Sequence, residues 1–90
     1  MPDNPSEIEA DQVLDVKGLN CPLPILRTKM VMGTMEPDQV LHVLTTDPHS
    51  VLDFKAFCAR TGHQLVHLVE GPEVYEFYLR RGPGSKQTTN

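Results

Sequence analysis

The sequence predicts one α/β domain whose elements follow the order strand, helix, strand, helix, strand, strand. Three observations favour this class. An alternating strand pattern runs into a proline-rich helix start at Cys21-Pro22, and an apolar strand pattern runs into another at Asp47-Pro48. Two further strand patterns then flank Gly71-Pro72, which is typical of a hairpin. Because crossovers between parallel strands are right-handed, both helices are expected on one face of the sheet.

Length and composition are consistent with a small protein of a reducing compartment. The 90 residues make one domain with a modest core, and the formal charge of −4 argues against broad affinity for nucleic acids. No apolar run approaches the roughly 20 residues that span a bilayer, and the N-terminus lacks the features of a secretory signal. Two cysteines without a paired framework favour the cytoplasm.

The first half of the chain contains a short strand and a helix. Residues 1–11 are polar and acidic and are expected to form a mobile arm before a domain over residues 12–81. Residues 13–17 alternate, so they predict a strand. Residues 22–35 predict the first helix, whose sheet-facing stripe has helical spacing and consists of Ile25, Thr28, Met32 and Met35.

The second half contains a central strand, a helix and a hairpin. Residues 40–46 are apolar on both faces and predict a central strand. Asp47 is expected to cap the second helix, with Pro48 at its first position. The inward stripe of that helix makes Cys58 a core residue. Strands are predicted at 63–70 and 73–81, followed by a disordered tail over residues 82–90.

The helix start at Cys21 is the strongest candidate for chemistry. Gly18 permits a sharp turn out of the first strand, and Pro22 and Pro24 fit the first helical turn. A thiol at a helix N-terminus is close to the positive end of the helix dipole, which favours the thiolate. We expect Cys21 to be presented and moderately activated; the alternative is a structural cysteine beside a capping turn.

A second apolar stripe runs along the first helix and consists of Leu23, Leu26 and Met30. It points nearly opposite to the sheet-facing stripe and has Arg27 beside it. Two interpretations stay open: the stripe packs against the second helix, or it is an exposed docking surface next to Cys21. Arg27 and Lys29 lie on different faces and are either solvated charges or contacts for an acidic partner surface or RNA.

Parallel first and second strands would place Cys21 and Asp47 at the same end of the sheet. Asp47 then either only caps its own helix or also acts near the sulfur. No metal site is expected, because His63 and His67, four residues apart on a strand, stand about 13 Å apart. Nor is a disulfide expected between Cys21 and Cys58.

Two blocks of sequence resemble the TusA (SirA-like) sulfur carrier family. The first combines Leu14-Asp15 and Gly18-Leu19 with Lys29 and a Cys-Pro-x-Pro motif at residues 21–24; the second contains Asp47-Pro48, Asp53, Phe57-Cys58 and Gly62-His63-Gln64-Leu65. The resemblance extends over about residues 13–81. It implies a two-layer sandwich like the C-terminal domain of initiation factor three, with a four-stranded mixed sheet whose last strand is antiparallel.

The resemblance also implies a function, that of a sulfur carrier with a persulfide on Cys21. A donor similar to a cysteine desulfurase or a rhodanese would supply the sulfur, and a cysteine of the next protein would receive it. No metal or organic cofactor is implied, and the protein would act within a relay rather than as a stand-alone enzyme. The residues expected to support Cys21 in this role are Gly18, Pro22, Pro24 and Asp47. In this family the sulfur feeds tRNA thiolation, molybdenum cofactor supply or sulfur oxidation, and the sequence leaves the pathway open.

Two other classes of function remain as alternatives. One is a regulatory or nucleic-acid-binding module in which Cys21 only helps to start the helix, although the sequence lacks a basic, aromatic strand face. The other is a thiol redox sensor that uses Cys21 alone. The protein is expected to be a monomer on its own, without direct RNA contact and without a membrane anchor.

Overall fold

The computed structural model describes residues 9–83 and confirms the predicted order of elements. Two helices alternate with the first strands, and a hairpin completes the domain. The elements are β1 (Gln12–Asp15), α1 (Leu23–Met32), β2 (Val40–Thr45), α2 (Ser50–Thr61), β3 (Gln64–Glu70) and β4 (Tyr75–Arg80).

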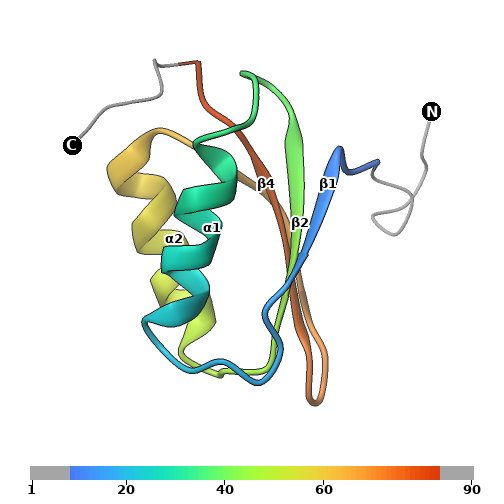
Figure 1. Ribbon diagram of the computed structural model, residues 1–90. Helices are drawn as coiled ribbons and strands as arrows, with labels where there is room; N and C mark the ends of the chain where they lie inside the picture. Colours follow the sequence, from blue (N-terminus) through green and yellow to red (C-terminus); the bar gives the residue numbers. More distant parts are fainter. Residues whose placement is uncertain (1–8, 84–90) are drawn as a thin grey trace.

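The four strands form one mixed sheet in the order β1-β2-β4-β3. β1 and β2 are parallel, whereas β4 is antiparallel to both β2 and β3. Both helices pack on one face, so the molecule is the predicted two-layer sandwich (Figure 1). β2 is central, as predicted from its two apolar faces. The sequence did not reveal that β4 is the second central strand, because the position of β4 between β2 and β3 depends on pairing between strands that are far apart in the sequence.

Several predicted boundaries need correction by a few residues. α1 ends at Met32, three residues early, although Met35 still reaches the core. Asp11, assigned to the arm, exchanges hydrogen bonds with Val40. Gly82, assigned to the tail, is buried and donates its N–H to Nδ1 of His63 at 2.8 Å. Both residues therefore belong to the folded domain, and most of the predicted arm and tail lies outside the described residues.

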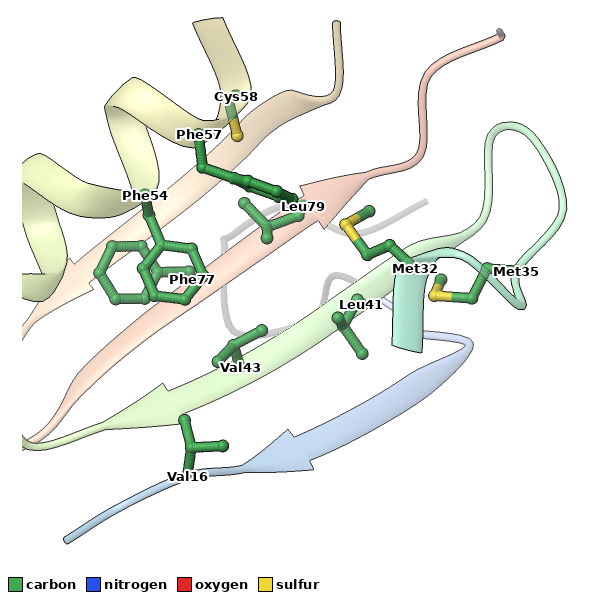
Figure 2. Close-up of a cluster of buried hydrophobic side chains, with 10 residues drawn as sticks. All are labelled: Val16, Met32, Met35, Leu41, Val43, Phe54, Phe57, Cys58, Phe77 and Leu79. Carbon is green, nitrogen blue, oxygen red and sulfur yellow. The ribbon is translucent and has the colours of Figure 1, made fainter. Parts of the chain in front are cut away.

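The core lies between the helices and the sheet (Figure 2). Phe54 of α2 stacks on Phe77 of β4 with ring centroids 4.3 Å apart, which joins the second helix to a central strand. The predicted stripe of α1 is confirmed, with Ile25 half-buried and Thr28, Met32 and Met35 buried. Cys58 lies in the same core, as the spacing of α2 predicted.

Thr28 leads to a stability prediction. Its side chain is 0% exposed, and within residues 9–83 its Oγ1 has no hydrogen-bond partner. A buried hydroxyl without a partner destabilises the fold, so Thr28→Val should raise the free energy of unfolding by about 1 kcal/mol. Chemical denaturation measures the change. Thr34→Val is the control, because exposed Thr34 bonds the carbonyl of Val31 and should bring no gain; a destabilised Thr28→Val would contradict the prediction.

Candidate functional site

The site is built where two loops meet at the carboxyl ends of the parallel strands β1 and β2 (Figure 1). The backbone N–H of Gly18 donates to Oγ1 of Thr46 at 2.9 Å. The backbone N–H of Cys21 donates to Oδ2 of Asp47 at 2.7 Å. The loop after β1 is thus tied to the loop after β2, and the prediction that Cys21 and Asp47 share this end of the sheet is confirmed.

Local sequence explains how Cys21 is presented. Gly18 has a φ of 89°, a left-handed conformation that other residues rarely adopt, so its predicted role in the turn is confirmed. Pro22 is the N-cap of α1, and Pro24 lies within the first helical turn. Cys21 directly precedes the N-cap, and its side chain is exposed. The thiol is therefore accessible, and it lies on a loop that is fixed by the turn at Gly18 and by the start of α1.

Asp47 does not cap the second helix in the way that the sequence predicted. The N-cap is His49, two residues later. Asp47 acts from outside the helix: its Oδ1 accepts the backbone N–H of His49 at 3.0 Å while its Oδ2 accepts that of Cys21. The carboxylate is buried at 8% exposure, which suits a group that joins two loops. Its position beside Cys21 favours the interpretation in which Asp47 supports the site as well as the helix.

The predicted activation of Cys21 is wrong in the free protein. A hydrogen bond to the Asp53 carboxylate raises the pKa of the Cys21 thiol above its ordinary value, and partial desolvation and the negative charges of Asp53 and Asp47 add to the shift. The helix dipole is outweighed because Pro22 and Pro24 lack the N–H groups through which a helix start stabilises an anion. These groups therefore disfavour the thiolate of Cys21 instead of promoting it.

The two cysteines differ in whether a reagent or a partner can reach the sulfur. Cys58 is buried in the core, and burial raises the pKa of its thiol to about 11. Both cysteines are free, so no disulfide joins them. Only Cys21 presents its sulfur to solvent, and it is the one thiol that a second protein can reach.

The second stripe of α1 is exposed. Leu23, Leu26 and Met30 are 43%, 49% and 70% exposed, so they do not pack into a buried interface with α2. We call these three residues the apolar patch. Arg27 and Lys29 are also exposed and form no ion pair within residues 9–83. The structure favours the docking interpretation, which requires an accessible apolar surface next to Cys21.

Three residues at this end of the molecule had been given no role in the site from the sequence. His49 places Nδ1 3.3 Å from Oδ1 of Asp47, and the Asp53 carboxylate raises the pKa of the Cys21 thiol. Leu52 is 72% exposed in the first turn of α2. The sequence contained an indication of their position, because a helix that begins at the carboxyl end of β2 places its first-turn side chains near the loop after β1.

Two kinds of site are absent from the described part of the chain. Across residues 9–83, no three side chains of His, Cys, Asp or Glu are grouped so that they could hold a metal ion. In the same range, neither helix has the length and apolarity needed to cross a membrane.

Asp47 gives the fold a predictable dependence on pH. The N–H groups of His49 and Cys21 lower the pKa of its carboxyl below the ordinary value, so its stabilising contribution is complete above that value and is lost as the pH falls through the lower, folded-state value. Asp47→Asn should cost about 1.5 kcal/mol at neutral pH, and this cost should shrink below about pH 4. Denaturant titrations against pH measure it. Glu73→Gln, an exposed carboxylate, is the control; a cost that does not change with pH would contradict the assignment.

Comparison with known proteins yields one family. The family model described as sulfurtransferase TusA matches residues 12–81. The sulfur carrier protein TusA of Allochromatium vinosum is 49% identical over 71 residues, which cover 79% of this chain and 93% of that protein. A crystal structure of a SirA-like protein from Desulfitobacterium hafniense superposes with a TM-score of 0.68 at 23% identity, covering 79% of this chain and 97% of the other. That structure supports the fold.

Proposed function

Because the chain belongs to the TusA family of sulfurtransferases and is a sulfur carrier in a sulfur relay, we propose that Cys21 is the residue that carries the sulfur, as a persulfide. One observation carries this proposal: Cys21 is exposed at the start of α1, whereas Cys58 is buried. A carrier must bring its sulfur within bonding distance of a cysteine on another protein. Cys21 meets that requirement without unfolding.

The transfer is an exchange at sulfur. In loading, the Cys21 sulfur attacks the terminal sulfur of a donor persulfide; a new S–S bond forms, the donor S–S bond breaks, and the electron pair leaves with the inner sulfur of the donor. The donor ends as a thiol and Cys21 as Cys21–SSH. In unloading, an acceptor thiolate attacks the terminal sulfur of Cys21–SSH, and the Cys21 thiol is regenerated. Neither step requires a metal or an organic cofactor.

A sulfur carrier interacts with donor and acceptor proteins, and we assign the apolar patch to those contacts. The patch begins two residues after Cys21, so a partner that covers it would bring its own sulfur close to Cys21. Arg27 and Lys29 add positive charge along the same helix, which favours partners with an acidic rim. Gly18, Pro22, Pro24 and Asp47 hold the loop that presents the thiol.

The partners and the place of the relay are also part of the proposal. A cysteine desulfurase or a rhodanese-type protein would supply the sulfur, and the protein would meet it as a monomer. We place the relay in the cytoplasm, where reducing conditions keep both cysteines as thiols. The acceptor would belong to tRNA thiolation, molybdenum cofactor supply or sulfur oxidation.

Mass spectrometry tests the assignment of Cys21. The protein is incubated with a cysteine desulfurase and cysteine, and intact mass and peptide mapping follow. We expect one adduct of about 32 Da, the mass of one sulfur atom, on the peptide that contains Cys21. An adduct on Cys58, or an unmodified protein beside a desulfurase shown to be active, would contradict the proposal.

A further inference from the structure

One carboxylate joins the reacting residue to an imidazole. Oδ2 of Asp47 accepts the backbone N–H of Cys21 at 2.7 Å, while Oδ1 accepts the backbone N–H of His49 at 3.0 Å and lies 3.3 Å from ring Nδ1 of His49. Asp47 is buried, so these contacts occupy both of its oxygens at a position largely shielded from water. His49 is therefore connected to the backbone of Cys21 through a single side chain.

The contact determines which nitrogen of the His49 ring carries a hydrogen. A carboxylate only accepts hydrogen bonds, so Nδ1 is the donor and Nε2 is left to gain or lose a proton. The side chain of His49 is 77% exposed, and among residues 9–83 no hydrogen bond reaches its Nε2. The ring can thus change charge without releasing Asp47, because Nδ1 keeps its hydrogen in both states.

The other three histidines lie elsewhere in the fold. His42 and His67 both contact the ring of Tyr78 on the sheet. His63 follows the end of α2, where its Nδ1 accepts a backbone N–H at 2.8 Å. Of the four histidines in the chain, His49 is the one that is joined to the reacting residue.

The charged groups around His49 are acidic. Asp47 contacts its ring, and Asp53, one turn along α2, donates its backbone N–H to the carbonyl of His49 at 3.1 Å. In the loop after β1, the ammonium group of Lys17 pairs with Asp15, 3.7 Å away. A protonated His49 would therefore form an ion pair with Asp47.

We propose that His49 is a positioning residue for sulfur loading, which holds Asp47 on the backbone of Cys21 and, when protonated, offsets the carboxylate charge next to the reacting sulfur. The inference rests on the proposed role of Cys21 as the sulfur-carrying residue. The pKa of the Cys21 thiol is raised by the Asp53 carboxylate, by partial desolvation and, in smaller part, by the negative charge of Asp47. An imidazolium bound to Oδ1 leaves the pair of Asp47 and His49 without net charge, so negative charge on the sulfur is opposed less.

The step that this charge assists is the attack of Cys21 on the donor. The Cys21 thiolate forms a bond to the terminal sulfur of the donor persulfide, the donor S–S bond breaks, and the electron pair leaves with the inner sulfur. The proton lost from Cys21 reaches that departing sulfur through solvent, so no oxidant or reductant is consumed. His49 changes only the fraction of Cys21 that is thiolate, which is the attacking form.

His49→Asn separates the charge of the ring from its hydrogen bond. The asparagine amide can donate to Oδ1 of Asp47 and suits an N-cap, but it cannot become cationic. A dipyridyl disulfide reacts with the full-length parent and variant at a series of pH values, and peptide mass follows the rate at Cys21. We expect the parent to react about twofold faster at about pH 5.5, which is the size of effect that an exposed charge has. The two rates should converge above about pH 8, where the imidazole is neutral.

The backbone amide of Cys21 gives a second measurement, which does not depend on reactivity. In NMR titrations of the parent, the chemical shift of the Cys21 N–H should move with the same midpoint as the ring of His49, because both groups contact Asp47. The step should be absent in His49→Asn. Since the titration of the parent needs no variant, it tests the inference even if His49→Asn fails to fold.

Controls separate this role from a structural one. His67→Asn removes an imidazole from the sheet and should react like the parent at every pH. A ratio of parent to His49→Asn rates that does not change with pH overturns the inference, and so does a Cys21 amide that does not respond to the titration of His49. Failure of the parent to acquire sulfur on Cys21 would overturn the proposed function instead. The two results are independent, because the exchange and NMR measurements use no sulfur donor.

Discussion

Cys21→Ser is expected to reduce sulfur loading to background and to leave the fold intact. The variant replaces one sulfur by oxygen, which forms no persulfide by exchange. The side chain is exposed, and the backbone N–H of residue 21 still donates to Asp47, so the free energy of unfolding should change by less than about 0.5 kcal/mol. Intact mass after incubation with a desulfurase and cysteine measures loading, and thermal melting measures the fold.

Cys58→Ala is the matched control for that experiment. It removes the other thiol from the core and should lower stability by roughly 1 to 2 kcal/mol while loading continues. Loading that persists in Cys21→Ser would contradict the assignment of Cys21. Tight RNA binding that survives Cys21→Ser and weakens steeply with salt would instead favour the nucleic-acid-binding alternative.

Much of the fold could be predicted because local patterns and the final structure agree. The spacing of Thr28 and Met32 on one face of α1, and of Phe54 and Cys58 on one face of α2, specified which sides of the helices are buried. Gly18 and Pro22 marked the turn and the helix start for reasons of backbone geometry alone. Such signals lie within a few residues of one another, so they can be read without knowing the sheet.

Contacts between residues that are far apart in the sequence could not be predicted in the same way. The capping preference of Asp47 was clear, but its carboxylate is shared with Cys21, 26 residues earlier, and the helix begins later than expected. The dipole of α1 favours a thiolate at Cys21, but α1 is not the only element beside the sulfur. Asp53 reverses the expected shift in the pKa of Cys21. It lies on α2, so its effect could be recognised only once the loop before α1 and the start of α2 are placed together.

Leu26→Asp, which places a charge in the apolar patch, is expected to have a large effect on sulfur transfer to the acceptor. Leu26 is 49% exposed, so the substitution should lower the free energy of unfolding by only about 0.5 kcal/mol. A partner that covers the patch would instead have to bury a carboxylate against apolar side chains. Losing a central apolar contact of about 2 kcal/mol corresponds to a decrease of roughly 30-fold in partner affinity. Sulfur transfer to the acceptor at limiting concentrations should decrease by a similar factor.

Val13→Asp is the control for Leu26→Asp, because it makes the same change in charge elsewhere. Val13 is 64% exposed and lies in β1 opposite His42, on the sheet face away from the helices. Transfer should therefore survive Val13→Asp and decrease in Leu26→Asp, while alkylation of Cys21 by iodoacetamide stays similar in both, since a small reagent does not need the patch. Thermal melting of both variants excludes unfolding as the cause. Equal transfer by the two variants would show that partners approach Cys21 from another direction, and the exposed stripe of α1 would then have no part in the relay.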